Sequence, residues 1–448
     1  MISLNIKKLS LLSSLSFAFI PISFIAGNLL INLNLVFLIL FGLLFVVQKN
    51  FKLNIQFLHW ILIFFITLVI ISSFYNEISL IKSFLYIRFY LLLIAVCILI
   101  ENNLINFKFF FISTIFCVFL ISFDIIFQSI FGFNILGYEN ALNSSLFDEE
   151  LIAGGYVQKF SIPTIFALGY LLKDNKKFNK SFIIPTIVIL GTSIVLSGNR
   201  VPAVSFFLGM ILFFGISTDH KKNIVIGTAI FILIFSILFK YNKTTNERYV
   251  NFYGNSSAIL KYFKFETENK IESEIKKKEK KKNPIDFALN YRGTGHLILY
   301  KTSLDVWGKK PIIGSGIKSF YKECINLEVE KGLEIDCNTH PHNIYLEILV
   351  SLGLVGLFLM IIVLFYMLYT YCIRGFYKLK NFNEAEKNIF FFSLLTLIIE
   401  LFPIKSTGSI FSTLNATFVF LMIALMLGTK KNLNFKFKKY TLWKKNKY

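Results

Sequence analysis

Charged side chains are scarce in this chain of 448 residues, since Asp, Glu, Lys and Arg make up only 16%. Hydrophobic residues make up 55%, and the mean hydropathy of +0.64 is far above that of an average soluble domain. The sequence therefore predicts a membrane protein. The net charge of +21 would also suit a nucleic-acid-binding protein, but a basic surplus is what many cytoplasmic loops require. We expect no nucleic-acid partner.

Three other patterns are missing. Lys7 and Lys8 precede an apolar run, but no convincing small-x-small cleavage site follows, so we predict an anchor that stays rather than a signal peptide. The segment Pro311–Gly316 has no preceding strand and no third glycine at the spacing of a dinucleotide fingerprint. No internal repeat of the kind that many transporters contain is evident.

Apolar runs are abundant. A membrane-spanning helix needs about 20 mostly apolar residues. By this measure we predict twelve transmembrane helices, of which the sixth is short: Leu9–Ala26, Leu29–Val47, Phe57–Phe74, Phe84–Ile100, Phe107–Phe131, Phe160–Leu172, Phe182–Leu196, Val201–Ser217, Ile224–Phe239, Ile344–Tyr371, Ile389–Ile404 and Ser409–Leu427.

Basic residues concentrate in the loops after the even-numbered helices and in the tail after Leu427, which we therefore place in the cytoplasm. The fold class is then an all-α polytopic membrane protein. Residues 1–239 form helices one to nine, 240–343 a large periplasmic insertion, and 344–448 helices ten to twelve with a basic cytoplasmic tail. The outward loops hold few basic residues, namely Lys82, Lys159, Arg200 and Lys405.

The insertion contains a lysine-rich run at 276–282, which is either a solvated surface or a segment that attracts phosphate-bearing lipids. After it, the spacing of four apolar residues predicts one helical face that packs on the membrane domain. Lys309-Lys310-Pro311 should end this helix. The four residues of the predicted face are Leu297, Tyr300, Leu304 and Trp307.

Cys324 and Cys337 also lie in the insertion, where a disulfide between them would close a short loop in an oxidising compartment. Cys97, Cys117 and Cys372 lie in apolar runs and are expected to be small core or lipid-facing residues.

Two histidines come together only in Thr339-His340-Pro341-His342-Asn343, where the insertion re-enters the membrane. We predict Asn343 as the N-cap of the helix that starts at Ile344. The positive end of a helix dipole lowers the pKa of a nearby histidine, which favours a neutral base. Interface packing and a metal pair are the alternatives, but no Asp, Glu or further His follows at ligand spacing, so no metal site is predicted.

Arg200 lies in a very short outer turn, Ser197–Pro202, and either anchors lipid headgroups or binds a phosphate in a bidentate manner. Arg292 and His296 either face the same cleft as Arg200 and the two histidines or lie on ordinary surface. Asp124 and Gln128 share one face of the fifth predicted helix, either as a functional site or as a buried hydrogen-bonded pair.

Together these features resemble the O-antigen ligase and polymerase superfamily of bacterial envelope glycosyltransferases. The resemblance runs from about Ser197 to about Leu364. It rests on the arginine in its tight outer turn, the large outer insertion, the stretch Pro311–Phe320, and above all His-Pro-His-Asn-Ile-Tyr-Leu-Glu-Ile-Leu-Val-Ser-Leu-Gly-Leu-Val-Gly at His340–Gly356.

The resemblance implies transfer of a glycan from an undecaprenyl-diphosphate carrier to an acceptor sugar hydroxyl, at the periplasmic face of the inner membrane. The transfer would proceed with inversion and without a metal or other cofactor. Ligases use a lipid A core sugar as acceptor, and polymerases use another lipid-linked repeat unit. Membrane lipids would be further partners.

By position, His342 matches the family's catalytic histidine, with His340 beside it, and Arg200 matches the arginine that binds the carrier diphosphate. The family's second arginine position falls on His296, with Arg292 one turn earlier. We favour Arg292 for that role, because a permanent charge suits it.

Two other classes of protein remain as alternatives. A polysaccharide flippase or transporter would have a similar number of helices, but the polar residues here concentrate at the outer surface rather than at mid-membrane. A structural scaffold would leave the His-Pro-His-Asn stretch without a purpose.

Overall fold

The computed structural model describes residues 5–48, 51, 53–139, 143–147, 152–173, 176–217, 220–242, 245–250, 295–332, 335, 337–376 and 384–429. Within these ranges the regular structure is helical, apart from one isolated bridge between Phe133 and Glu139. The predicted all-α fold class agrees with this part of the chain. The lysine-rich run at 276–282 lies outside the described residues.

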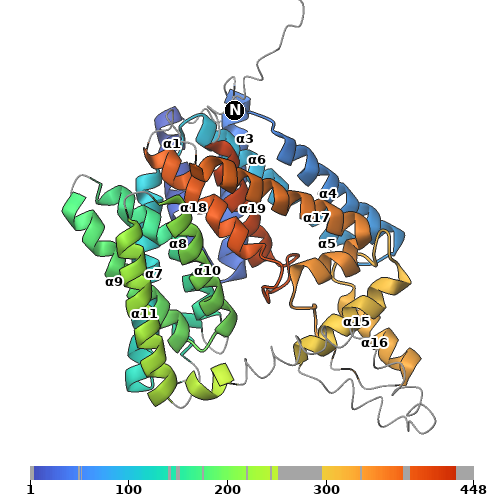
Figure 1. Ribbon diagram of the computed structural model, residues 1–448. Helices are drawn as coiled ribbons and strands as arrows, with labels where there is room; N and C mark the ends of the chain where they lie inside the picture. The colour runs from blue at the N-terminus through green and yellow to red at the C-terminus, as the bar shows by residue number, and fades with distance from the viewer. Residues whose placement is uncertain are drawn as a thin grey trace, which may run out of the picture.

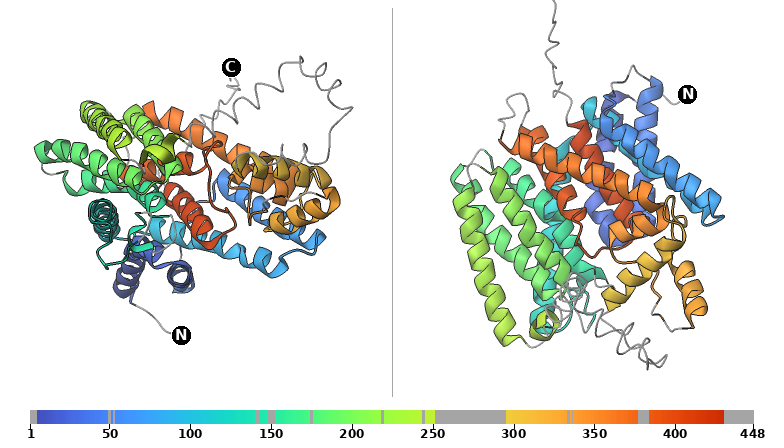
Figure 2. Two further views of the ribbon diagram at one scale, coloured as in Figure 1. Left: turned by 90° about the horizontal axis from the view of Figure 1, so that it is seen from below. Right: turned by 45° about the vertical axis from the view of Figure 1, so that its right-hand side comes forward.

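The helices form an apolar bundle with a smaller helix pair beside it (Figures 1 and 2). The pair consists of α15 (Gly295–Lys309) and α16 (Phe320–Lys331), and both of its members contact α17. The bundle comprises α1 (Ile6–Ala18), α2 (Ile20–Ala26), α3 (Asn28–Gln48), α4 (Phe57–Tyr75), α5 (Leu80–Leu85), α6 (Ile87–Glu101), α7 (Phe107–Phe131), α8 (Ala153–Leu171), α9 (Lys176–Leu196), α10 (Arg200–Ile216), α11 (Lys221–Tyr241), α17 (Ile344–Phe376), α18 (Glu384–Glu400) and α19 (Thr413–Gly428).

Every predicted transmembrane segment overlaps one helix or one helix pair of the bundle. Six spans among the described residues are long and apolar enough to cross a membrane by themselves. A seventh is reached if α1 and α2, bent by 43°, count as one broken span. The chain is thus a multi-pass membrane protein, and the count of twelve stays a prediction. The six spans are α3, α4, Leu80–Glu101, α7, α11 and Ile344–Cys372.

Several predicted boundaries were wrong. Helices α9 and α18 begin earlier than predicted, at Lys176 and Glu384. Helix α18 ends at Glu400 and α19 begins at Thr413, so the predicted end at Ile404 and the predicted start at Ser409 lie in the loop between them.

Two further boundaries differ for reasons that the structure shows. The first predicted helix is divided, because Pro21 lies in the first turn of α2, where its missing N–H costs nothing. The sixth begins at Ala153, seven residues before Phe160. A Cβ on Gly154 would lie 2.1 Å from Ser197 Oγ, so the start of α8 packs through small residues that carry no apolar periodicity.

The predicted apolar face of the insertion helix was also partly wrong. Lys309 ends α15 as expected, but Leu304 is 48% exposed. The buried apolar residues of α15 are Ile298, Leu299 and Val306, which pack against Cys324, Leu327 and Val350 from α16 and α17. The buried apolar positions are therefore displaced around the helix by about one residue from the predicted positions. The reason is that α15 contacts two helices, α16 and α17, rather than a single surface.

Asp124 and Gln128 organise the loop after α7. Asp124 Oδ1 accepts a hydrogen bond from Ile135 N at 2.7 Å, and Oδ2 accepts one from Ser145 Oγ at 2.6 Å. Gln128 Oε1 accepts one from Ser145 N at 2.9 Å. Both side chains thus bind the loop rather than each other, which assigns them a structural role.

Helix α17 is broken at Gly353, whose φ of 64° and ψ of −160° are accessible to almost no residue except glycine. The break removes helical partners from the carbonyls of Val350 and Ser351 and from the N–H groups of Leu354 and Val355. Unpaired backbone groups are costly away from water, so this helix requires partners from elsewhere in the chain.

The turn Pro311–Gly316 supplies those partners. The N–H groups of Ser315 and Gly316 donate to the carbonyls of Val350 and Ser351 at 2.8 and 2.9 Å. The carbonyls of Pro311 and Ile312 accept from Leu354 and Val355 at 2.8 and 3.3 Å. The glycine-rich turn therefore completes the backbone hydrogen bonding of a broken membrane helix.

The close approach depends on two glycines. A Cβ on Gly314 would lie 2.4 Å from Leu352 N, and a Cβ on Gly353 would lie 2.2 Å from Ile312 O. The end of α4 completes the junction, because Ser72 Oγ reaches both Ile313 O and Ser351 O, at 2.6 and 2.8 Å.

Replacing Gly353 with Ala should therefore destabilise the protein by about 2–5 kcal/mol, since it combines a disallowed backbone conformation with a clash against backbone. Thermal unfolding of the purified protein in detergent checks this. Gly308→Ala is the matched control, because Gly308 lies in α15 with nothing within 4 Å of a new Cβ. It should be neutral or stabilise by up to about 1 kcal/mol. Equal unfolding midpoints for the two variants would contradict the role given to the junction.

Candidate functional site

The two histidines lie together immediately before α17. Their ring centroids are 4.2 Å apart, with 49° between the ring planes. His342 has a φ of +56°, an uncommon conformation for a residue other than glycine and one that often marks functional positions. The backbone carbonyl of His342 accepts a hydrogen bond from Thr407 N at 2.9 Å. Thr407 lies in the loop between α18 and α19, so this loop holds His342 in its conformation.

Asn343 forms the predicted N-cap. Its Oδ1 accepts hydrogen bonds from Tyr345 N and Leu346 N at 2.9 and 3.1 Å, and its Nδ2 donates to Pro403 O at 2.7 Å. The cap thus joins the start of α17 to the 401–412 loop, the segment between α18 and α19.

Asn338 contacts the ring of His342. The Oδ1 atom of Asn338 accepts from Thr339 N at 2.7 Å, so its amide nitrogen faces His342 Nε2, at 3.0 Å. An amide nitrogen only donates, so this contact requires the His342 tautomer whose Nε2 accepts. That tautomer is the one in which Nε2 could act as a general base.

The pKa of His340 is lowered, which favours its neutral form. Burial lowers its pKa, and a hydrogen bond with the Thr407 backbone opposes that shift only in part. Its Nδ1 lies 3.0 Å from Thr339 Oγ1, and its buried Nε2 has no hydrogen-bond partner. His340 therefore places a partly buried imidazole with a lowered pKa against His342. No group of three His, Cys, Asp or Glu side chains that could hold a metal ion occurs in the described ranges.

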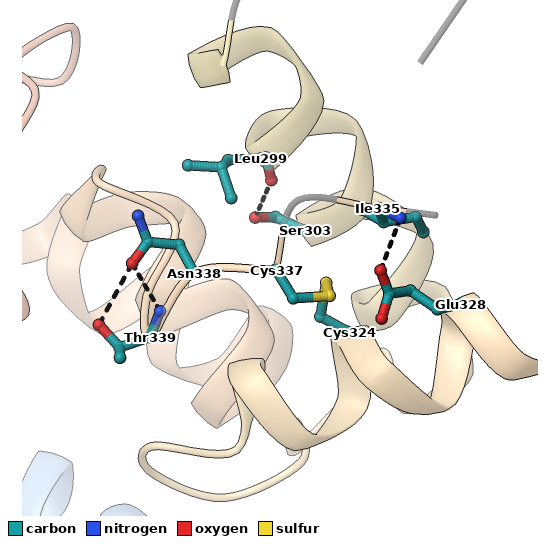
Figure 3. Close-up of a disulfide and its surroundings, with 8 residues drawn as sticks. All are labelled: Leu299, Ser303, Cys324, Glu328, Ile335, Cys337, Asn338 and Thr339. Carbon is teal, nitrogen blue, oxygen red and sulfur yellow. Dashed lines mark hydrogen bonds between the residues drawn. A yellow bond between two sulfur atoms is a disulfide. The ribbon is translucent and has the colours of Figure 1, made fainter. Parts of the chain in front are cut away.

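The disulfide lies just upstream of this segment (Figure 3). Cys324 on α16 and Cys337 have Cα atoms 5.8 Å apart and are joined by their sulfur atoms. Cys337 directly precedes Asn338, the residue that binds His342. The structure thus brings the predicted cysteine pair together at a place where it limits the movement of the histidine segment.

A buried ion-pair cluster connects the start of the 401–412 loop to α8. Glu400 binds Lys159 Nζ at 2.5 Å and Lys405 Nζ at 2.6 Å. Lys405 also donates to Gln158 Oε1 at 3.1 Å, and Lys159 lies 4.7 Å from the centre of the Phe418 ring. All the charged groups are at most 15% exposed. Two lysines share one carboxylate, so the cluster has a net charge of +1.

Lys405 lies outside the helices, and burial lowers its pKa. Glu400 opposes that shift and Lys159 adds to it. The sequence pattern placed Lys159 and Lys405 in separate outer loops and missed Glu400, because their pairing appears only when α8 and α18 meet.

Arg200 begins α10 after the turn at Ser197–Asn199. Its Nη1 donates to Arg248 O at 3.3 Å, from the short helix at 245–250. The side chain of Arg248 covers Gly198, because a Cβ there would lie 1.5 Å from Arg248 Nη1. Arg200 and Arg248 therefore both lie at this turn.

Tyr249 completes this group. Burial raises its pKa to about 12, although both arginines oppose the shift, and its buried hydroxyl has no hydrogen-bond partner. Burial also lowers the pKa of Arg248, and the charge of Arg200 lowers it further. Two neighbouring cations and an unused hydroxyl donor form an arrangement that an anion would stabilise.

The other predicted cations are not placed by the structure. Arg292 lies outside the described residues, and only the backbone of His296 is described, in the first turn of α15. Arg248 was missed from the sequence, because nothing in its local pattern connects it to a turn 48 residues earlier.

Residues 185–361 match a family model described as O-Antigen ligase. The matched segment contains Arg200, Arg248, the described part of the insertion and the histidine segment. This confirms the resemblance to the O-antigen ligase and polymerase superfamily and indicates a glycosyltransferase-like enzyme that acts on lipid-linked glycans. No curated protein matches the chain.

Replacing Glu400 with Gln should destabilise the protein by about 3–5 kcal/mol, because two buried lysines would lose their only shared carboxylate. Glu330→Gln is the matched control: the same change removes an exposed ion pair with Lys309 and should cost under about 1 kcal/mol. Thermal unfolding in detergent measures both. Similar midpoints for the two variants would show that the buried cluster contributes no more than a surface pair.

Proposed function

We propose that the chain transfers a glycan from an undecaprenyl-diphosphate carrier to an acceptor sugar hydroxyl, at the periplasmic face of the inner membrane. The observation that supports this proposal is the His340–His342 pair at the start of a membrane helix, inside the segment matched by the O-antigen ligase model.

His342 acts as the general base. The acceptor hydroxyl takes the place of the Asn338 amide at Nε2, and its proton moves to that nitrogen as the oxygen attacks the anomeric carbon. The bond from this carbon to the diphosphate oxygen breaks, and the diphosphate leaves with the electron pair. Attack opposite the leaving group inverts the anomeric centre. His340 packs against His342 and orients its ring.

Arg200 and Arg248 bind the carrier diphosphate. Negative charge develops on this leaving group, so fixed cations stabilise the transition state more than the ground state. The Tyr249 hydroxyl, which is buried without a hydrogen-bond partner, would donate to the same oxygens. This assignment gives the second-arginine role to Arg248 in place of the predicted Arg292 or His296. No step of this scheme requires a metal ion.

A ligase and a polymerase share this chemistry and differ in the acceptor, which is a lipid A core sugar in one case and a lipid-linked repeat unit in the other. We favour the ligase, in agreement with the description of the matched family. A deletion strain separates the two: loss of long chains on lipid A core with accumulating carrier-linked polymer indicates a ligase, and a single-repeat product indicates a polymerase.

His342→Ala should lower glycan transfer by about 10²–10⁴-fold while the protein still inserts into the membrane, because a positioned base contributes about that factor. Surface-glycan ladders from the variant in the deletion strain measure the loss. His220→Ala is the control, since His220 precedes α11, at the opposite end of that helix from residues 245–250. Normal ladders from His342→Ala would disprove the catalytic assignment.

Arg200→Lys and Arg248→Lys should each lower kcat/KM for the donor about 10–100-fold, since an ammonium cannot make a bidentate contact worth about 1.5–3 kcal/mol. Lys322→Gln, on the exposed surface of α16, is the control and should be silent. Wild-type activity in Arg200→Lys would favour a lipid-headgroup anchor at Arg200. Wild-type activity in Arg248→Lys would return the second diphosphate site to Arg292 or His296.

A further inference from the structure

Asn338 and Thr339 contact both histidine rings, and the scheme above uses neither of them as a ligand of the substrate. Asn338 Nδ2 lies 3.0 Å from His342 Nε2, and Thr339 Oγ1 lies 3.0 Å from His340 Nδ1. The two ring centroids are themselves 4.2 Å apart. One polar side chain therefore lies at a ring nitrogen of each histidine.

The backbone of Thr339 orients the amide of Asn338. Thr339 N donates to Asn338 Oδ1 at 2.7 Å, and a backbone N–H requires an oxygen at that place. Figure 3 shows the oxygen of Asn338 turned toward Thr339 and its nitrogen on the opposite side. The NH2 group is thus the part of the amide that faces His342.

Two separate parts of the chain hold the partners of this contact. Cys337, which precedes Asn338, is bonded to Cys324, and Cys324 is buried among the apolar residues that join α15, α16 and α17. The carbonyl of His342 accepts from Thr407 N at 2.9 Å, in the 401–412 loop. The disulfide therefore holds the amide, and the loop holds the imidazole.

The contact is open to solvent in the part of the chain that the structure describes, since Asn338 and Thr339 are both exposed. A substrate hydroxyl can reach the amide and Nε2 without the displacement of a helix. An exposed hydrogen bond contributes little to folding stability, because both of its groups could bind water instead. The contact therefore matters chiefly because it places a donor beside the nitrogen of the base.

An amide NH2 group carries two N–H bonds, so it can face Nε2 and still donate to a second acceptor. The amide nitrogen is 3.0 Å from Nε2, and an oxygen bound at Nε2 lies within hydrogen-bond reach of both nitrogens. A hydroxyl can donate to Nε2 and accept from the amide at the same time. A protonated amine can only donate, so this pair of groups selects a hydroxyl.

We propose that Asn338 is an acceptor-binding residue, whose amide N–H donates to the oxygen of the hydroxyl that His342 deprotonates. This inference rests on the proposed function. As the hydroxyl enters at Nε2, the amide N–H turns from the ring nitrogen to the hydroxyl oxygen. The proton of the hydroxyl passes to Nε2, the oxygen bonds to the anomeric carbon, and the amide keeps its own protons. Its hydrogen bond stabilises the negative charge that develops on the oxygen as the proton leaves.

Asn338→Asp separates this role from a structural one. Aspartate has the shape of asparagine and keeps an oxygen for Thr339 N, but it has no N–H to donate. It should lower kcat/KM for the acceptor about 10–100-fold, because a hydrogen bond to a group that develops charge is worth about that factor. The KM for the donor should stay unchanged. The assay uses the full-length protein in vesicles, with carrier-linked glycan as donor and membranes of the deletion strain as the source of acceptor.

A second measurement does not depend on activity. The carboxylate of Asn338→Asp faces Nε2 and favours a protonated imidazole, so the pH at which His342 titrates should rise by about one pH unit or more. Asn338→Ala should lose acceptor activity without this rise. NMR of histidine-labelled protein measures the titration, and His342→Ala identifies the signal among the five histidines. The neighbouring ring of His340 is followed in the same spectra.

Asn326→Asp is the matched control, since Asn326 lies on the exposed surface of α16. The same change of charge there should alter neither kcat/KM nor the His342 titration. The unfolding midpoint of Asn338→Asp should equal that of the wild type, and a lowered midpoint with lost activity would assign Asn338 a structural role instead.

Full acceptor activity in Asn338→Asp would overturn the inference, because this variant loses only the donor. A His342 titration that Asn338→Asp does not change would also overturn it, because the amide would then not face Nε2. An inactive wild-type protein would overturn the proposed function and with it the acceptor role, whereas the titration would still report the contact between Asn338 and His342.

Discussion

The backbone hydrogen bonds between the broken part of α17 around Gly353 and the turn Pro311–Gly316 are the constraint that positions the insertion helices and the start of α17. A broken membrane helix leaves carbonyl and N–H groups that lipid cannot satisfy. The turn satisfies them, and in doing so it fixes the depth at which the insertion meets the bundle. The histidine segment, which directly precedes α17, is then placed relative to this junction.

The 401–412 loop connects the parts of the site. It holds His342 through Thr407, Asn343 through Pro403, and Glu347 through Ile410. The buried Glu400 cluster secures this loop at its base. A carboxylate shared by two lysines is a costly way to stabilise a fold, since desolvation offsets most of the attraction. Its value here is that it fixes one loop conformation, and with it the histidine geometry.

Local patterns in the sequence were enough for the helical membrane fold, the Asn343 cap and the end of α15, because each depends on residues close together in the chain. They also singled out the cysteines that the structure pairs. The Glu400 cluster was out of reach, since Lys159 and Glu400 are 241 residues apart. Arg248 was missed for a similar reason. From sequence alone Lys159 looks like a loop charge, whereas it lies inside α8 and pairs with Glu400 once α8 packs on α18.

The face of α15 was missed for another reason. A stripe of apolar residues predicts a helix packed on one surface, but α15 packs between α16 and α17, and Thr302 and Ser303 are buried with it. Ser303 Oγ donates to Leu299 O at 2.6 Å, so a polar side chain is satisfied within its own helix and enters the core. Hydrophobic periodicity cannot distinguish such a serine from an exposed one. The same ambiguity applies to Ser72, which sequence alone assigns to a helix end and which in fact closes the junction at Gly353.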